Sequence, residues 1–316
     1  MSNNLKLAGV IISRVFAISE TFYDILFNKG KPVSACPGGA MLNSSISLGR
    51  ASIPISFISE FARDNVGTII CEFLRENNVS TEYLHLYEGS SPLSLAFLND
   101  RNDATYDFYE DFPQERLRIS IPSFGPEDIV MFGSILAVTK EVRTRLEDLL
   151  HSAKNAGCTI LYDPNFRSSQ LPLLEEIKPL ITKNIAYSDI VRASDEDMKM
   201  IHGCMNSDEA YDFIRMNGCK FLIYTSSSDG VYLKTPSFSK YYSVPVIETV
   251  STVGAGDSFN AGIAYMLHSK KIRDICCVSE QVWDEIIGKA IDFASQVCMN
   301  TDNYISNNFA TGLKKI

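Results

Sequence analysis

The chain has 316 residues, of which 45% are hydrophobic and 21% are charged, and its formal net charge is -9 at pH 7. This length fits one large α/β domain or two ordinary ones, and the hydrophobic content supports a sizeable buried core. Because the negative charge repels polyanions, it disfavours nucleic acids and anionic membrane surfaces as partners.

The cysteines and the start of the chain predict the compartment. The eight cysteines include no C-x-x-C pair and have no histidine cluster nearby, so we expect free thiols in a reducing cytosol. Residues 7–18 are the only stretch that resembles a targeting segment, but Arg14 interrupts it and no small-residue cleavage pattern follows. No apolar run is long enough to span a bilayer. The sequence therefore predicts a cytoplasmic protein.

Two hairpins are expected in the first third of the chain. Residues 25–33 contain two strand patterns around a polar turn, in which Gly30 can hold a positive φ. A second extended segment at residues 94–98 precedes a polar tip at residues 99–104. After this tip comes an aromatic run that suits a half-buried strand face, namely Tyr106, Phe108 and Tyr109.

Short apolar strands then alternate with helical segments, behind a loose extension at residues 1–13. The expected strands include residues 15–19, 55–58, 129–132, 159–162 and 190–192. The expected helices include residues 66–77, 140–156, 174–184 and 282–297. Apolar strands separated by helices indicate a parallel sheet covered on both faces. Ligands of such sheets bind at the carboxyl ends of the strands.

Two polar motifs follow expected strands. D-P-N-F-R, residues 163–167, places Arg167 where a planar cation suits a phosphate site, and a surface salt bridge fits as well. S-D-E-D, residues 194–197, offers Asp197 or Glu196 as oxygen ligands of a hard cation, directly or through water. A helix N-cap followed by first-turn acids explains this second motif equally well.

The stretch S-T-V-G-A-G-D-S-F-N-A-G, residues 251–262, places a glycine-rich turn before an acidic residue and a helical pattern. Gly254 and Gly256 allow backbone amides to approach an anion, and a helix start favours negative charge. Asp257 suits either a base that takes a proton from a hydroxyl attacking a phosphate, or a helix N-cap. The stretch does not match the Walker A motif, because Asp257 stands where that motif needs Lys. It does not match the dinucleotide-binding fingerprint either, because Phe259 stands where the third glycine is needed.

This stretch resembles the D-T-x-G-A-G-D-x-F signature of the ribokinase-like or PfkB sugar kinases, and its wording is most similar to that of fructokinase-type members. The resemblance implies that Asp257 is the catalytic base and that the amides of Gly254, Ala255 and Gly256 form an anion hole. It also assigns Gly254 and Gly256 to the nucleotide site. Ser251 departs from the signature, because the family has there an Asp associated with a monovalent-cation site.

The same resemblance assigns the sugar site. S-E-T-F-Y-D is similar to the family's G-E-x-x-x-D, with Ser19 in place of the glycine, which implies that Asp24 holds sugar hydroxyls. Without the resemblance, an Asp after a strand is more often a turn former. P-G-G-A-M-L-N matches the family's G-G-x-x-x-N, which implies that Gly38, Gly39 and Asn43 bind the sugar. The structural alternative is a plain glycine-rich helix entry.

Three further segments have counterparts in the family. D-P-N-F-R matches D-x-N-x-R, which places Arg167 at the substrate. T-S-S-S-D-G resembles T-x-G-x-x-G and assigns Thr225 and Gly230 to the nucleotide, although Ser227 replaces the middle glycine. S-D-E-D stands where the family has N-x-x-E, a segment that helps to organise magnesium, so Asp197 is the expected metal-site residue.

The resemblance implies a three-layer α/β/α ribokinase-like fold with a mostly parallel central sheet over residues 14–316. A small β-sheet lid would come from the segments near 25–36 and 92–112, and through it the chain would form a homodimer. The implied activity is ATP-dependent, magnesium-assisted transfer of the γ-phosphoryl group to a primary hydroxyl of a small sugar, D-fructose. Ribose, a 2-keto-3-deoxy sugar acid and a nucleoside are the alternative substrates. A non-catalytic sugar-binding regulator on the same fold and a Rossmann dehydrogenase, which lacks its glycine fingerprint here, are the alternative functions.

Overall fold

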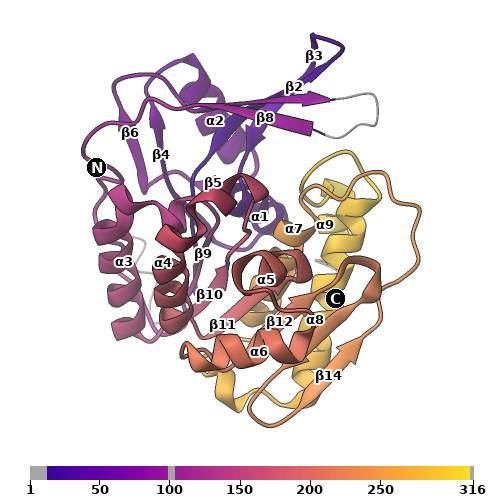
Figure 1. The fold of residues 1–316 in the computed structure, drawn as a ribbon. Helices are drawn as coiled ribbons and strands as arrows, with labels where there is room; N and C mark the ends of the chain where they lie inside the picture. The colour runs from indigo at the N-terminus through magenta and orange to yellow at the C-terminus, as the bar shows by residue number, and fades with distance from the viewer. Residues whose placement is uncertain (1–12, 99–103, 314–316) are drawn as a thin grey trace.

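A ten-stranded sheet runs through the protein in a computed structural model that describes residues 13–98 and 104–313 (Figure 1). The strand order is β14-β13-β12-β11-β10-β9-β1-β4-β5, and β6 also pairs with β4. The strands are β1 (Val15–Ile18), β4 (Ile55–Ala62), β5 (Val79–Ser80), β6 (Leu84–Tyr87), β9 (Ile129–Gly133), β10 (Thr159–Asp163), β11 (Ile190–Ser194), β12 (Leu222–Thr225), β13 (Val231–Lys234) and β14 (Ser239–Tyr242).

The centre of this sheet is parallel. β1 pairs in parallel with β4 and β9, and β10, β11 and β12 continue the parallel run. Every residue of β1, β9 and β10 is buried, as expected for strands that have helices on both faces. β13 and β14 add an antiparallel edge beyond β12. The expected strands are confirmed, and the carboxyl ends of the parallel run all lie at one edge of the sheet.

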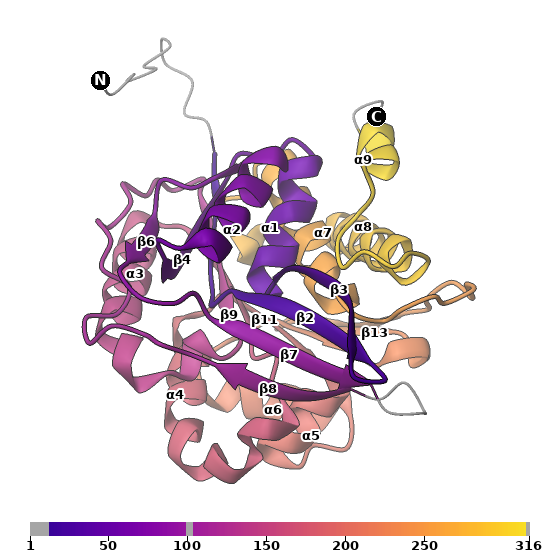
Figure 2. The same ribbon diagram turned by 90° about the horizontal axis from the view of Figure 1, so that it is seen from above.

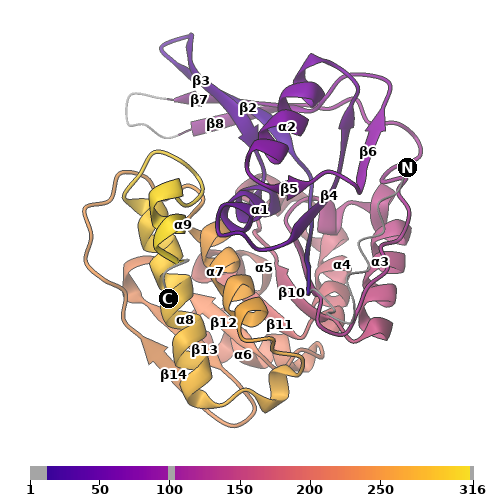
Figure 3. The ribbon, with the colours of Figure 1, turned by 180° about the vertical axis from the view of Figure 1, so that it is seen from behind.

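Helices cover both faces of the sheet. On one face α3, α4, α5 and α6 share a hydrophobic core with the strands, and this layer faces the viewer in Figure 1. On the other face α1, α2, α7, α8 and α9 form a second core, seen from behind in Figure 3. The helices are α1 (Ala40–Arg50), α2 (Asn65–Glu76), α3 (Arg143–Ala156), α4 (Leu174–Tyr187), α5 (Asp195–His202), α6 (Ser207–Met216), α7 (Ala255–Ser269), α8 (Glu280–Cys298) and α9 (Asn307–Leu313).

Local sequence explains where several helices begin and end. The Asp64 carboxylate accepts a hydrogen bond from the Gly67 amide at 2.7 Å and so caps α2. α3 ends at Gly157, whose φ of 81° is in the left-handed region that glycine adopts without strain. The helix expected at residues 140–156 is partly wrong, because Lys140–Val142 forms a 3-10 turn and the α-helix begins at Arg143. Tight i to i+3 bonds of this kind are common beside helix starts.

A separate four-stranded sheet forms the lid, in the order β3-β2-β7-β8 (Figure 2). Its strands are β2 (Phe22–Asn28), β3 (Lys31–Gly38), β7 (Leu93–Leu98) and β8 (Ala104–Tyr109). The first expected hairpin is confirmed, because β2 and β3 are antiparallel around a turn in which Lys29 and Gly30 have φ of 50° and 74°. β7 and β8 form the second hairpin, and most of its polar tip lies outside the described residues.

Two expectations from the sequence concern the N-terminal extension and the absence of membrane-spanning helices. Nearly all of the extension expected at residues 1–13 lies outside the described residues. Within residues 13–98 and 104–313, no helix combines the length and the apolar character needed to cross a membrane.

Candidate active site

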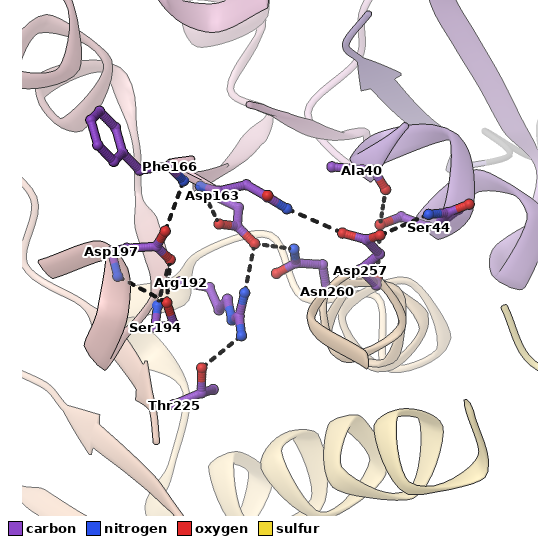
Figure 4. A network of polar contacts seen from close by, with 12 residues as sticks. Ala40, Ser44, Asp163, Phe166, Arg192, Ser194, Asp197, Thr225, Asp257 and Asn260 are labelled. Carbon is purple, nitrogen blue, oxygen red and sulfur yellow. Dashed lines mark hydrogen bonds and ion pairs between the residues drawn. The ribbon is translucent and has the colours of Figure 1, made fainter. Parts of the chain in front are cut away.

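The polar side chains predicted to be functional gather where the carboxyl ends of β10, β11 and β12 meet the first turns of α1 and α7 (Figure 4). Thr225 is the last residue of β12, Asp163 is the last residue of β10, and Asp257 lies in the first turn of α7. Segments far apart in the sequence therefore contribute to one site, at the sheet edge where parallel α/β proteins bind ligands.

The glycine-rich turn before α7 has the backbone that its sequence predicted. Gly254 has a φ of 79°, and a Cβ there would collide with the backbone of Asn303. A Cβ on Gly256 would lie 2.7 Å from Nη1 of Arg192. Both positions therefore need glycine, Gly254 for its conformation and both for the close approach of another group. The amide of Ala255 donates to the Thr252 carbonyl at 3.2 Å, so it already has a partner within the turn.

Asp257 is not a helix cap. α7 has Gly254 at its N-cap position and no side chain caps it, so the cap interpretation is wrong. The carboxylate instead accepts hydrogen bonds from two amides, Asn43 Nδ2 at 2.9 Å and Asn165 Nδ2 at 3.2 Å. The residue is only 6% exposed, and burial raises the pKa of the Asp257 carboxyl to about 6. A buried carboxylate with a raised pKa is better suited to accept a proton near neutral pH than an exposed one.

Asp24 lies on β2 of the lid, and burial raises the pKa of its carboxyl to about 6, although a hydrogen bond with Ser94 lowers it. A Cβ on Gly38 would collide with the Asp24 carboxylate, so the second glycine-rich segment packs directly against this side chain. Gly39 has a φ of 136° and precedes α1 as its N-cap residue. Asp24, Gly38 and Gly39 are thus brought together.

Arg167 is near enough to both acids of the site for its charge to act on them. The positive charge of Arg167 lowers the pKa of both the Asp24 and the Asp257 carboxyl groups, although burial outweighs it in each case. Its side chain is exposed. An exposed arginine near two carboxylates can bind a negatively charged group of a substrate.

The expected nucleotide segment has a structural reason for its glycine. Gly230 has a φ of 98°, and its missing Cβ leaves room for the Tyr242 carbonyl oxygen, which would be 2.5 Å away, and for the Tyr241 ring. The hydroxyl of Thr225 accepts a hydrogen bond from Arg192 Nη2 at 2.6 Å. Both residues lie at the strand end beside α7, and their nucleotide contacts remain a prediction.

Asp197 has the helix-capping role that the sequence left open. Its Oδ2 accepts from the amide and the hydroxyl of Ser194, and its Oδ1 accepts from the Phe166 amide at 2.7 Å. Ser194 and Asp197 form a reciprocal capping box at the start of α5. Both carboxylate oxygens are therefore occupied, and the side chain is poorly placed to ligate a metal directly.

The described residues do not form a magnesium site made of protein ligands alone. Within residues 13–98 and 104–313, no cluster of three or more His, Cys, Asp or Glu side chains has metal-binding geometry. Mg²⁺ binds substrate phosphates and keeps several waters rather than requiring an all-protein site.

Four residues of this site, Arg192, Asp163, Asn260 and Asn165, have no role predicted from the sequence. Arg192 and Asp163 form a buried ion pair at 2.9 Å. Asn260 Nδ2 also donates to Asp163 at 2.6 Å, and Asn165 bonds Asp257 as described above. Two signals could have identified them. Arg192 interrupts an otherwise apolar strand, and Asn260 stands three positions after Asp257, on the same face of a helix.

Comparison with known proteins gives related enzymes over most of the chain. Aminoimidazole riboside kinase from Salmonella typhimurium (strain LT2) is 24% identical over 275 residues, which is 86% of either chain. A fructokinase from Rhizobium leguminosarum bv. trifolii is 31% identical over 252 residues, covering 77% of this chain and 76% of the relative.

Solved structures show the same fold. The Salmonella enterica aminoimidazole riboside kinase, complexed with aminoimidazole riboside and an ATP analogue, superposes with a TM-score of 0.81 at 21% identity, covering 96% of this chain and 99% of the other. A fructokinase double mutant from Vibrio cholerae O395, with fructose, ADP and potassium bound, has a TM-score of 0.82 at 18% identity and covers 96% and 98% of the two chains. The expected ribokinase-like fold, with its mostly parallel main sheet and four-stranded lid, is confirmed.

The family model described as the pfkB family carbohydrate kinase matches residues 3–298, nearly the whole chain. The family model and the curated relatives agree on a phosphotransferase that acts on an alcohol group and uses ATP. The chain belongs to the pfkB family of carbohydrate kinases.

Proposed function

We propose that this kinase transfers the γ-phosphoryl group of magnesium-ATP to the primary hydroxyl of a small sugar, D-fructose. The observation that carries the proposal is the position of Asp257, a buried carboxylate beside the glycine turn and held by Asn43 and Asn165. Such a group can take the hydroxyl proton as the oxygen attacks phosphorus. A binding protein without catalysis would have no use for a desolvated carboxylate at this point.

The turn beside the base would stabilise the transferred group. The first N–H groups of α7 have no intrahelical partners, and the positive end of the helix dipole lies at this same N-terminus. In our proposal the amides of Gly254, Ala255 and Gly256 stabilise the negative charge of the phosphoryl group during transfer, and the Ala255 amide gives up its hydrogen bond to the Thr252 carbonyl to do so. Thr225 and Gly230 would lie beside the nucleotide, and magnesium bound to ATP would neutralise charge on its phosphates.

Asp24, Gly38, Gly39 and Asn43 would hold the sugar beneath the lid. A buried carboxylate that accepts two hydroxyl hydrogen bonds discriminates against an analogue without them, since an unpaired acceptor costs about 1 to 3 kcal/mol. We therefore expect Asp24→Asn to raise the KM of the sugar and to leave the KM of magnesium-ATP nearly unchanged. Asp107→Asn is the matched control, because Asp107 stands on β8 of the same lid and pairs with Leu95, on the strand face opposite to Asp24.

A riboside is the second candidate substrate. The relative named aminoimidazole riboside kinase aligns over 86% of this chain, more than the fructokinase from Rhizobium leguminosarum does. Both substrates present a primary hydroxyl, so the same base serves either. A sugar acid also belongs in the comparison, because Arg167 places a positive charge near Asp24.

The test is an ATP-coupled assay of kcat/KM over fructose, ribose, 2-keto-3-deoxygluconate, aminoimidazole riboside and other nucleosides. We expect fructose to have the highest kcat/KM. If another compound of this panel has a higher kcat/KM than fructose, that compound is the better substrate, and the proposed phosphoryl transfer still holds. If none is phosphorylated with magnesium-ATP, the proposed activity is wrong and a sugar-binding regulator becomes the better description.

A further inference from the structure

Arg192 is the one charged side chain in the parallel strand β11, and its guanidinium is buried at the floor of the active site (Figure 4). Nη1 donates to Asp163 Oδ2 at 2.9 Å, and Nη2 donates to Thr225 Oγ1 at 2.6 Å. Asp163 ends β10 and Thr225 ends β12, the two neighbours of β11. One planar group therefore ties together the carboxyl ends of three adjacent strands.

The same guanidinium lies next to Gly256, in the first turn of α7. The nearest atom to a Cβ built on Gly256 is Nη1 of Arg192, at 2.7 Å, followed by the carbon and the other terminal nitrogen of the guanidinium. The backbone at Gly256 therefore packs closely against the guanidinium group of Arg192. A Cβ at position 256 would push the guanidinium away from its hydrogen bonds with Asp163 and Thr225.

Asp163 connects Arg192 to the helix that carries the base. Its Oδ2 also accepts from Asn260 Nδ2 at 2.6 Å, and Asn260 lies on α7, one turn after Asp257. Its Oδ1 accepts from the Asn165 amide at 2.9 Å, and Asn165 Nδ2 reaches Asp257 Oδ1. Two routes of hydrogen bonds thus run from Arg192 through Asp163, one to the helix and one to the Asp257 carboxylate.

The charges around Arg192 explain why a permanent cation is needed there. Burial alone would lower the pKa of the Arg192 guanidinium, but Asp163, Asp197 and Asp257 together raise it. Asp163 is fully buried, so without Arg192 its negative charge would have no cationic partner among the described residues. An uncompensated buried charge forces either protonation or rearrangement of the surrounding groups. Either change would reach the turn and the base.

We propose that Arg192 is a positioning residue for phosphoryl transfer: it fixes the first turn of α7 at Gly256, here called the Gly256 turn, and, through Asp163 and Asn260, the orientation of Asp257. The proposal rests on the proposed kinase activity. Lys cannot replace Arg here, because an ammonium has no planar fork that reaches Asp163 and Thr225 while supporting the turn. Displacing a catalytic group by about 1 Å is enough to reduce a rate on the order of 100-fold.

The first test compares Arg192→Lys with Arg143→Lys. Arg143 is a matched control, because it is also buried, pairs with Glu147 at 2.7 Å and donates to Asn184, but lies on α3 away from the site. We expect Arg192→Lys to lower kcat by about 10- to 100-fold with less than about a threefold change in either KM, whereas Arg143→Lys keeps kcat. A large rise in the KM of magnesium-ATP without loss of kcat would show direct phosphate binding and overturn the positioning role.

A second variant addresses the case in which Arg192→Lys does not fold. Asn260→Ala removes only the link from Asp163 to α7 and retains the ion pair. We expect Asn260→Ala by itself to lower kcat with little change in either KM. Where Arg192→Lys does fold, the loss in Asn260→Ala should be the smaller one, and the loss in the double variant should be less than additive, because both changes act through Asp163. Unchanged kcat in Asn260→Ala, or full additivity in the double variant, contradicts the proposed route.

A structural readout separates this proposal from the kinase activity itself. Crystal structures of the wild type and of Arg192→Lys, both with magnesium-ADP, should show the Gly256 turn displaced relative to Asp163 in the variant. An unmoved turn overturns the proposal whether or not the protein phosphorylates fructose. Absence of turnover in the wild type with every acceptor would instead refute the proposed function and leave this comparison of turn positions decisive.

Discussion

Asn43 in α1 donates a hydrogen bond from Nδ2 to Oδ2 of Asp257 in α7 at 2.9 Å, across a separation of 214 residues. The neighbouring Ser44 hydroxyl donates to the backbone carbonyl of Asp257 at 2.7 Å. Two successive residues of α1 thus hold both the side chain and the main chain of the proposed base. The proposed base and a proposed sugar ligand are therefore parts of one rigid arrangement between two helices.

Replacing Asp257 by Asn should lower kcat by about 10²- to 10⁴-fold, the range for loss of a general base, with little change in the KM of either substrate. Asn retains the shape of the side chain and loses only the proton-accepting carboxylate. Initial-rate kinetics over both substrates measure this. The control is Asp274→Asn, because Asp274 caps an exposed 3-10 turn elsewhere. Near-normal kcat in the Asp257 variant would show that another group accepts the proton.

The rate should fall in mildly acidic solution. Burial raises the pKa of the Asp257 carboxyl to about 6, so this base becomes protonated and inactive as the pH falls through that value. Asp24 has a pKa raised to about 6 by burial as well, so kcat/KM for the sugar should fall more steeply than kcat. Profiles of kcat and kcat/KM from pH 5 to pH 8 check this. An acid limb centred near pH 4 would contradict a buried, desolvated base.

The same burial makes Asp257 a source of instability. Because its pKa is higher in the folded chain than the ordinary 3.8, the folded state holds the proton more tightly, and stability is lost as the pH rises through 6. Asp257→Asn should therefore increase the free energy of unfolding, by at most about 3 kcal/mol at pH 8 and about half of that at pH 5. Urea unfolding at both pH values measures the difference. A gain that is larger at pH 5 would refute this account.

Potassium should activate this kinase less than the family signature suggests. Ser251 offers a neutral hydroxyl where the signature has Asp, and a neutral group attracts a monovalent cation weakly. We expect a small change in kcat when potassium is exchanged for a large organic cation at constant ionic strength. Ser251→Asp should increase the dependence on potassium. Complete loss of wild-type activity without potassium would show that the site is intact in spite of Ser251.

The lid should mediate dimer formation. Seen from above in Figure 2, no helix of the described residues covers the lid sheet. The face of this sheet opposite to Asp24 carries half-buried apolar side chains, namely Ile25, Phe27, Leu95 and Phe97. Phe27 and Phe97 stack with ring centroids 4.9 Å apart, and an apolar sheet face of this kind is a typical subunit contact. Phe97→Lys should convert a dimer to a monomer in light scattering, while the neighbouring polar change Thr105→Ser should not. A monomeric wild type would rule out this interface.

Local sequence determined the main elements of this protein. Continuous apolar runs at residues 129–132 and 159–162 identify buried parallel strands, because such strands meet helices on both faces. The turn at Gly30 follows from the need for positive φ at a two-residue hairpin. The glycine turn at Gly254 was likewise readable, since few other residues adopt its conformation without strain. These features depend on neighbours in the chain, which a sequence displays directly.

Only the tertiary structure decided what the polar residues do. The sequence allowed Asp257 to be a helix cap, and the structure excludes this because Asn43 and Asn165 approach it from distant segments. The reverse holds for Asp197, whose carboxylate is taken up by capping contacts with Ser194 and by the Phe166 amide. Arg192 carried no motif at all, although it joins three strand ends. The partners of a buried polar group come from elsewhere in the chain, so folding must first bring them together.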